Sequence, residues 1–342
     1  MNKLLTIVIP TYNMQDYLRR CLDSLLVSDE QLQQLEVLVI NDGSKDNSSA
    51  IAHEYETKYP NTFRVIDKEN GNYGSCINRG LAEAIGKYIK VLDADDWFDT
   101  DNFSDFLTFL SGTDTDMVLS DFDQLSGKGV VLNPAHYGMD SDRIYSIRDI
   151  PRKKLFLMHA VTYKRSIFDG LNYHQTEGIS YTDQEWIFLP LTRVNTFRYF
   201  PKVVYKYLIG REGQTMDPNI YNTNISHTIR CANTIMGEYE QHYDQVDEAH
   251  REFMDWRLTS RLQLIYHHLL IKDLSPAGLE ALKEFDKNMQ INYPRAYEFG
   301  NRLIISKRIP YRYISDYRRA YSAQTIGLVL YRLYLSIRSK IG

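Results

Sequence analysis

Residues 88–97, Tyr-Ile-Lys-Val-Leu-Asp-Ala-Asp-Asp-Trp, join an apolar run to a cluster of carboxylates. Five acids and no Lys or Arg lie between Asp93 and Asp101, so the segment contains no compensating positive charge. The apolar run predicts a buried strand, and alternate side chains of an extended chain would put Asp93 and Asp95 on one face. Carboxylates that converge at a strand end suit Mg²⁺ or Mn²⁺, with open positions for phosphate oxygens. For a motif this short, solvated loop acids are the alternative.

Two further strands are expected upstream, at residues 4–10 and 36–40, because both are short apolar runs bounded by turn residues. Gly43 lets the chain leave the second strand sharply, so Asp42 lies at the carboxyl end of that strand. Open α/β sheets bind ligands outside this end of their strands, and an Asp there could accept hydrogen bonds from a base or a ribose. The sequence therefore predicts a nucleotide-binding α/β domain.

A third strand is expected at residues 63–67, and it leads into a glycine-containing segment at residues 70–80. Glycines let backbone N–H groups approach an anion, and Ser75 would open a helix whose N-terminus favours negative charge. Asn78 and Arg79, one turn into that helix, could reach the same ligand. An ordinary turn followed by a helix cap is the alternative interpretation.

Four motifs, taken together and in this order, resemble those of family 2 inverting glycosyltransferases with the GT-A fold. They are Ile9-Pro10-Thr11-Tyr12-Asn13, Asn41-Asp42-Gly43-Ser44, Asn78-Arg79-Gly80 and Asp93-Ala94-Asp95-Asp96. The resemblance covers about residues 1–215 and implies a nucleotide-sugar donor, usually a uridine diphosphate (UDP) sugar.

The resemblance also implies roles for individual residues. Tyr12 would lie against the base, Asp42 would bind it, Asp93 would lie near the ribose, and Asp95 would ligate Mn²⁺ or Mg²⁺ on the diphosphate. The full set expected to bind the donor is Pro10, Tyr12, Asp42, Asn78, Arg79, Asp93 and Arg211.

Inverting transfer needs a base that deprotonates the acceptor hydroxyl on the face opposite the leaving diphosphate. Asp183 opens an expected helix and matches the position of the family's catalytic base. Members of the family usually carry Glu-Asp here, whereas this chain has Thr182-Asp183, with Glu185 two residues further on. Asp183 is therefore the predicted base and Glu185 the alternative. Asp183 could also serve only to stabilise the helix dipole.

Residues 205–215 resemble the flexible loop that follows the catalytic helix in this family. Lys206 and Arg211 are candidate counter-charges for the leaving diphosphate, because preorganised cations stabilise the charge that develops there. An ordinary surface ion pair is the alternative for either residue.

Composition bounds the remaining questions. With 342 residues, 43% of them apolar, the chain can bury a full core and has room for two domains. A net charge of −4 gives no support to nucleic-acid binding. The three cysteines have no paired spacing, which indicates reduced thiols in a reducing compartment. No signal peptide is apparent, so a cytoplasmic location is expected.

The sequence predicts two domains: a GT-A-like α/β domain with a mainly parallel sheet at residues 1–215, and a helical domain at residues 216–342. Residues 294–342 contain ten Lys and Arg residues against two acids, Glu298 and Asp316. The amphipathic segment at residues 325–341 could lie on the anionic inner face of the plasma membrane. It could instead pack on its own catalytic domain or on a second subunit of a homo-oligomer.

The expected function is metal-dependent, inverting transfer of a sugar from a nucleotide-diphosphate donor. By resemblance, the acceptor would be a saccharide linked to polyprenyl diphosphate, used for bacterial surface polysaccharide. A sugar nucleotidyltransferase is an alternative, but that class resembles a family with Gly-Thr-Arg after the first strand, where this chain has Pro10-Thr11-Tyr12. A non-catalytic carbohydrate-binding protein on the same fold is the other alternative, and the retained Asp42, Asp95 and Asp183 argue against it.

Overall fold

The structure is a computed structural model that describes residues 3–211, 214 and 225–341. The chain forms two compact units, residues 1–227 and 228–342, and each is described by itself below. The domain boundary expected after residue 215 falls outside the described residues.

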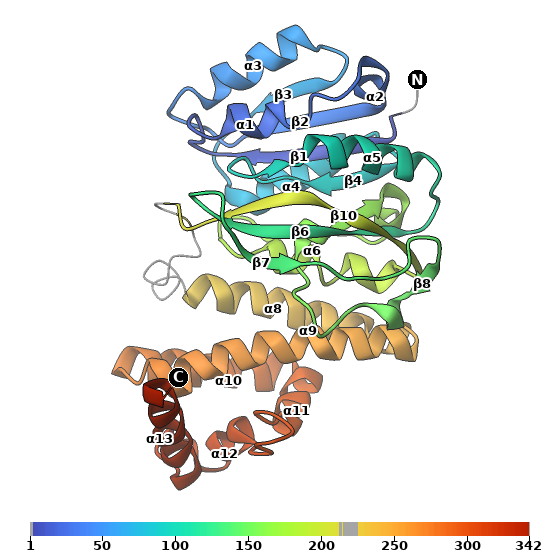
Figure 1. Ribbon diagram of the computed structural model, residues 1–342. Helices are drawn as coiled ribbons and strands as arrows, with labels where there is room; N and C mark the ends of the chain where they lie inside the picture. Colours follow the sequence, from blue (N-terminus) through green and yellow to red (C-terminus); the bar gives the residue numbers. More distant parts are fainter. Residues whose placement is uncertain (1–2, 212–213, 215–224, 342) are drawn as a thin grey trace. The chain divides into compact units, whose positions relative to one another are not determined.

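The first unit is built on one sheet, which contains ten strands in the described part of the chain (Figure 1). The strand order is β3-β2-β1-β4-β9-β6-β10-β5, with β7 paired to β6 and β8 paired to β10. The strands are β1 (Leu5–Thr11), β2 (Leu35–Asn41), β3 (Phe63–Asp67), β4 (Tyr88–Val91), β5 (Trp97–Phe98), β6 (Met117–Ser126), β7 (Val131–Ala135), β8 (Ile144–Ser146), β9 (Val161–Lys164) and β10 (Thr196–Ile209).

Parallel pairing predominates in the part of the sheet that was predicted from sequence. Strands β3, β2, β1 and β4 are parallel neighbours, and β6 is parallel to β10. Strand β9 enters antiparallel between β4 and β6, and β5 is antiparallel to β10. Every residue of β2 and β4 is buried, as expected for parallel strands that are covered on both faces. The predicted α/β class is confirmed.

The helices of the first unit follow the strands and lie on both faces of the sheet (Figure 1). They are α1 (Leu18–Asp23), α2 (Asp29–Gln34), α3 (Ser48–Lys58), α4 (Asn72–Glu83), α5 (Thr100–Ser111) and the single turn α6 (Asp183–Trp186). Residues 205–209 belong to strand β10, which corrects the expectation that they lie in a loop after a strand.

Helix α4 also differs from the sequence prediction. It begins at Asn72, so Ser75 lies inside the helix rather than opening it. The glycines of this segment permit close packing: a Cβ atom at Gly74 would lie 2.1 Å from the carbonyl oxygen of Thr176, and one at Gly80 would lie 2.4 Å from Val8 Cγ1. The helix can therefore approach β1 and residue 176 only because these positions lack side chains.

The second unit is helical, as predicted. Its helices are α8 (Ile225–His242), α9 (Glu248–His267), which continues as a π-helical turn at His268–Lys272, α10 (Pro276–Asn292), α11 (Pro294–Arg302), α12 (Tyr313–Ala320) and α13 (Ile326–Ile341). A buried ion pair holds α12 in place, because Arg318 Nε donates to Asp286 Oδ1 of α10 at 2.8 Å. Among the described residues, no helix has the length and apolar character needed to cross a membrane.

Candidate active site

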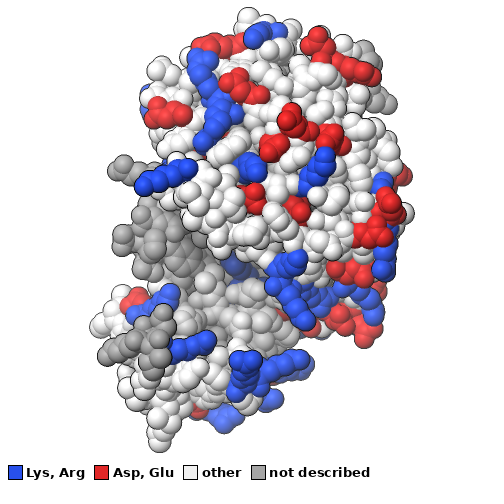
Figure 2. Space-filling model, viewed as in Figure 1, with Lys and Arg blue, Asp and Glu red and all other residues white. Residues whose placement is uncertain are grey.

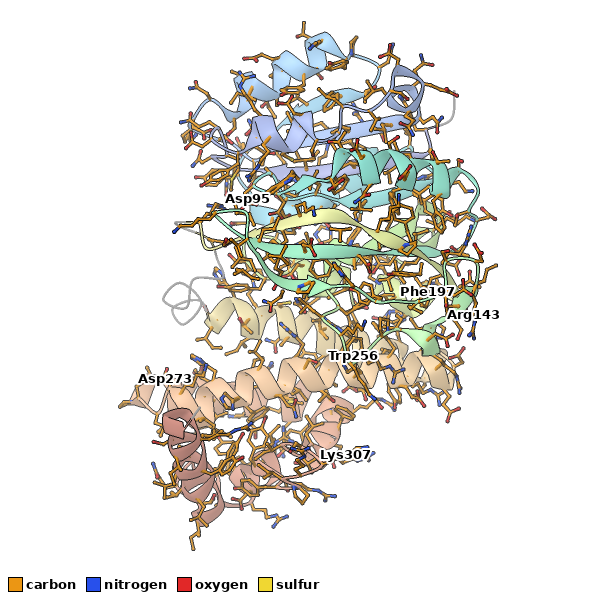
Figure 3. All side chains as sticks on the ribbon, in the orientation of Figure 1. Asp95, Arg143, Phe197, Trp256, Asp273 and Lys307 are labelled. Atoms are coloured by element: carbon orange, nitrogen blue, oxygen red, sulfur yellow. The ribbon has the colours of Figure 1, made fainter. Side chains whose placement is uncertain are left out.

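A pocket of about 270 Å³ opens where the parallel strands end, and it contains the acids that were singled out in the sequence. Figure 3 places Asp95 at this edge of the sheet. The lining includes Asp93, Asp95, Asp183 and Arg211, together with Pro10. The structure thus brings together side chains that are more than 200 positions apart in the sequence.

The acids after β4 lie in a turn instead of continuing the strand. Strand β4 ends at Val91, and the backbone N–H of Asp96 donates to the carbonyl oxygen of Asp93 at 3.0 Å. The predicted extended conformation therefore stops before the carboxylates. Asp93 and Asp95 nevertheless both line the pocket, because the turn directs the two side chains to it.

Asp95 is bonded to a cation that comes from the end of β10. Arg211 Nε donates to Asp95 Oδ2 at 2.6 Å, and Arg20 donates to the backbone oxygen of Asp95 at 3.0 Å. Asp95 and Arg211 are about four-fifths or more buried, so solvent screens their attraction only weakly. Arg211 therefore lies beside the residue that was predicted to bind the metal.

Asp93 and Asp96 differ in their surroundings. Tyr73 donates to Asp93 Oδ1 at 2.9 Å, and burial, with a further contribution from the charge of Asp95, raises the pKa of Asp93 to about 8. Asp96 accepts from the Tyr205 hydroxyl and from the Leu208 N–H, each at 2.7 Å, and burial raises its pKa as well. Asp93 and Asp95 both line the pocket and offer carboxylate oxygens, the kind of ligand that Mg²⁺ and Mn²⁺ prefer.

The two candidate bases point to different surroundings. Asp183 is the first residue of α6 and lines the pocket, where Gln184 donates to its Oδ2 at 2.6 Å. Glu185 is 3% exposed, and its Oε2 accepts from the Thr176 N–H at 2.7 Å, away from the pocket lining. The geometry therefore favours Asp183 as the group that can meet a substrate and gives Glu185 a structural role.

Asp42 and Tyr12 lie next to this pocket but do not line it. Asp42 is buried, and its Oδ1 accepts from Lys68 Nζ at 2.6 Å and from the Gly71 N–H at 2.9 Å. The backbone N–H of Asp42 donates to the Thr11 oxygen at 2.8 Å, which brings it close to Tyr12, a residue that is 45% exposed.

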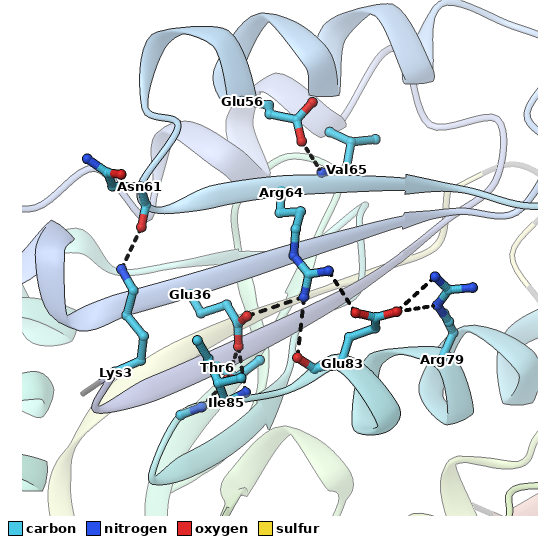
Figure 4. Close-up of polar contacts among 11 residues, drawn as sticks. Lys3, Thr6, Glu36, Glu56, Asn61, Arg64, Val65, Arg79, Glu83 and Ile85 are labelled. Atoms are coloured by element: carbon cyan, nitrogen blue, oxygen red, sulfur yellow. Dashed lines mark hydrogen bonds and ion pairs between the residues drawn. The ribbon is translucent and has the colours of Figure 1, made fainter. Parts of the chain in front are cut away.

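Asn78 and Arg79 are engaged elsewhere. Asn78 exchanges hydrogen bonds with the backbone of Gln175, at 2.9 and 2.8 Å, and so joins α4 to the segment before α6. Arg79 pairs with Glu83 of its own helix, and Glu83 also pairs with Arg64 of β3 (Figure 4). The structure does not bring either residue to the pocket lining.

Lys206 forms ion pairs, but its side chain and that of Asp123 are largely buried, so they are not the surface pair that was the alternative for this residue. Its Nζ lies 3.2 Å from Asp123 and 3.9 Å from Asp99, so it forms ion pairs along the sheet. Lys206 is also absent from the pocket lining, unlike Arg211.

Sequence reasoning did not identify His159. This residue is 5% exposed and lines the pocket, and neither of its ring nitrogens has a hydrogen-bond partner among the described residues. Its ring stacks on Tyr207 with centroids 4.1 Å apart. Burial, and then the charge of Lys90, lowers its pKa to about 3, so the imidazole is neutral. A single His in Met-His-Ala gave no signal that it would lie close to acids 63 residues upstream.

Comparisons with known proteins show that the chain is similar to glycosyltransferases. MG025 of Mycoplasma genitalium, an uncharacterized glycosyltransferase, is 41% identical over 121 residues, which are 35% of this chain and 39% of MG025. The minor teichoic acid biosynthesis protein GgaB of Bacillus subtilis is 35% identical over 104 residues, which are 30% of this chain and 12% of GgaB. The chain thus matches less than half the length of either relative.

A solved structure shows that the likeness in fold extends over most of the chain. The match to the crystal structure of S. aureus TarS 1-349 in complex with UDP-GlcNAc covers 93% of this chain and 92% of that 1-349 chain, with a TM-score of 0.65 and 19% identity. Residues 6–172 match the family model described as glycosyl transferase family 2. Residues 6–172, just under half of the chain, therefore form a glycosyl transferase family 2 domain.

Proposed function

We propose that this protein transfers a sugar, with inversion, from a nucleotide-diphosphate donor to a hydroxyl group of a saccharide acceptor. The observation that carries the proposal is that Asp183 faces the same pocket as Asp93, Asp95 and Arg211. Such a transfer requires a carboxylate that accepts the proton of the acceptor hydroxyl. It also requires groups that stabilise the negative charge of the leaving diphosphate.

In the proposed reaction, Asp183 accepts the proton of the acceptor hydroxyl as its oxygen attacks the anomeric carbon of the sugar. A new carbon–oxygen bond forms on one face of the sugar while the bond to the diphosphate breaks on the other. The bonding electrons leave with the nucleoside diphosphate, whose negative charge Arg211 is placed to contact.

A divalent ion held by Asp95 on the diphosphate would offset the leaving charge when it is bound. Arg211 forms an ion pair with Asp95, so its guanidinium group is held beside this carboxylate before a substrate binds. Such preorganisation reduces the rearrangement needed during the reaction. Asn78 and Arg79 have structural partners and play no part in this proposal.

A UDP-sugar is the donor that we propose. Support comes from TarS, which has the same fold and was crystallised with UDP-GlcNAc. Pro10 and Asp93 line the pocket, and Tyr12 and Asp42 lie beside it, so the nucleotide would extend from the pocket along the edge of the sheet. In this arrangement Tyr12 would lie against the base and Asp42 would accept a hydrogen bond from it.

For the acceptor, we propose a lipid-linked saccharide used to build a bacterial surface polymer. The similarity to GgaB, whose name refers to teichoic acid biosynthesis, supports this class of product. The second unit supports a lipid-linked acceptor, because its helix α13 exposes an apolar face that could contact a membrane. Its exposed residues, spaced at helical intervals, are Ile326 (82%), Leu330 (60%), Leu333 (54%) and Ile337 (59%).

The second unit also carries positive charge on its surface. In Figure 2, Lys and Arg side chains gather on the visible surface of the second unit. A shallow apolar helix with nearby cations binds reversibly to anionic lipid, and each cation contributes about 1 kcal/mol that salt can screen. We therefore propose peripheral attachment to the inner face of the plasma membrane, where a lipid-linked acceptor would be found.

The transfer is tested with the full chain, Mn²⁺ or Mg²⁺, a panel of nucleotide sugars and a mixed pool of saccharide acceptors. Thermal stabilisation selects the donor, since a ligand at ~100 times its dissociation constant adds roughly 2.7 kcal/mol. Mass spectrometry then identifies the products. A glycosylated acceptor with released nucleoside diphosphate supports the proposal. Exchange with pyrophosphate would indicate a nucleotidyltransferase, and donor binding without turnover would indicate a carbohydrate-binding protein.

A further inference from the structure

A second group of possible metal ligands, which does not include Asp95, consists of Asp93 and His159 of the pocket lining and the fully buried Asp96. One carboxylate oxygen each from Asp93 and Asp96 and one ring nitrogen of His159 all lie within 4.8 Å of one another. His159 is only 5% exposed, and no described residue forms a hydrogen bond with its ring nitrogens. A buried polar group without a partner costs about 1–3 kcal/mol, so an imidazole in this position calls for a ligand.

We propose that Asp93, Asp96 and His159 bind a divalent transition-metal ion, and that they do so without a nucleotide. Opposite ligands of an ion with bonds of about 2.1 Å are separated by roughly 4.2 Å. Only one of the three pairs can be opposite, and adjacent ligands lie roughly 3.0 Å apart, so atoms that lie within 4.8 Å of one another would move inward to hold the ion. Three protein ligands can hold an ion by themselves, whereas Asp95 alone would need phosphate oxygens to complete its coordination.

Surrounding groups hold the proposed ligands in position. Tyr73 donates to Asp93, while Tyr205 and the Leu208 N–H donate to Asp96. Each carboxylate oxygen has two lone pairs, so these bonds leave acceptor capacity for an ion. Stacking on Tyr207 fixes the plane of the His159 ring. Outer partners of this kind orient metal ligands and support affinity.

The charges around the site permit a cation. Asp95 adds a third carboxylate at this corner, and Arg211 is paired with it. Lys90 is the opposing charge, and its Nζ donates to the carbonyl oxygens of His159 and Val161. A nitrogen ligand favours transition metals over Mg²⁺, which prefers an all-oxygen shell. The expected preference is therefore Co²⁺ or Mn²⁺ over Mg²⁺.

The test measures metal binding by the metal-free full chain in the absence of nucleotide. Mn²⁺ titrations are followed by the loss of the free-ion signal in electron paramagnetic resonance, and the bound ion is examined for coupling to ¹⁴N. His159→Gln and Asp93→Asn should each weaken binding by at least about tenfold, the lower limit seen for outer partners of metal sites. Asp95→Asn should retain it.

A matched control is available in His136, whose ring nitrogen lies 2.9 Å from Asp123 and whose side chain is 51% exposed. His136→Gln removes a His–Asp pair outside the pocket and should leave Mn²⁺ binding unchanged. Circular dichroism and thermal unfolding check that each variant is folded, and the ¹⁴N measurement on the wild-type protein requires no variant.

Three results would overturn the inference. They are the absence of ¹⁴N coupling in wild-type protein, binding that requires a nucleotide, and binding that is lost in Asp95→Asn but kept in His159→Gln. None of these readouts depends on sugar transfer, so the metal site and the proposed function can fail separately.

Discussion

Asp183→Asn tests the assignment of the catalytic base most directly. The amide keeps the shape of the side chain, and its oxygen can still accept from Gln184, as the carboxylate oxygen does at 2.6 Å. It cannot take the acceptor proton. General bases contribute about 10²- to 10⁴-fold, so we expect kcat to fall by this factor, equivalent to roughly 2.7–5.4 kcal/mol of activation free energy. The dissociation constant of the donor should change little.

Glu185→Gln is the matched comparison, since it makes the same chemical change two residues away. Glu185 is buried and accepts from the Thr176 N–H at 2.7 Å, away from the pocket lining. A hydrogen bond to a charged group is worth about 1.5–3 kcal/mol and one to a neutral group about 1 kcal/mol. The substitution should therefore cost about 1 kcal/mol of unfolding free energy, or about 2–4 °C in Tm for a unit of this size.

The assay is initial-rate release of nucleoside diphosphate with saturating acceptor, together with calorimetric donor binding and thermal unfolding of each variant. We expect Asp183→Asn to lose turnover with an unchanged Tm, and Glu185→Gln to lose stability with a kcat near that of the wild type. If Asp183→Asn kept kcat within a factor of about three, the reasoning would be refuted. A large loss of kcat in Glu185→Gln alone would transfer the role to that residue.

Three further predictions follow from the geometry of the described residues. Asp95→Asn should abolish metal-dependent binding of UDP in calorimetry with Mn²⁺, and an unchanged affinity would remove the metal assignment. Burial lowers the pKa of Lys90 to about 7 from 10.5, so the unfolded state binds more protons between these values and stability rises with pH. In denaturant unfolding, the wild type should gain stability relative to Lys90→Met by up to about 1.4 kcal/mol per pH unit between pH 7 and 10.5; a constant difference would contradict this prediction. The double variant Leu330→Gln/Leu333→Gln should release the protein from anionic vesicles in cosedimentation, whereas Ile291→Gln, which changes an apolar residue of α10 that is 66% exposed, should not. Equal pelleting of all three proteins would argue against membrane attachment by α13.

The structure also shows why membrane binding by α13 should be tested with substitutions and not by deleting the C-terminal residues. Removal of residues 318–342 would delete Arg318, which pairs with the buried Asp286 at 2.8 Å. Loss of one partner of a buried ion pair costs about 3–5 kcal/mol, so such a truncation would combine a stability effect with any loss of membrane binding. Substitutions on the exposed face of α13 avoid this difficulty.

The sequence by itself determined the α/β class and the edge of the sheet at which the site lies. Apolar runs that end in Pro10, Asp42 or Asp93 mark the ends of parallel strands, and parallel strands place their carboxyl ends at one edge. Both the run and its terminating residue are local features, so they can be read without knowledge of distant contacts. Asp93 and Asp95 do line one pocket, but through a turn after β4 and not through the extended chain on which the prediction of a shared face was based.

Only the tertiary structure decided which side chains complete the site. His159 comes to Asp93 because β9 inserts antiparallel between β4 and β6, a pairing that no local pattern records. Arg79 turns to Glu83 in the same helix instead of reaching the pocket, and Glu185 bonds to Thr176 while Asp183 faces the cavity. Sequence periodicity specifies neighbours within a turn or along a strand, whereas contacts between residues far apart in the chain depend on how the whole sheet packs.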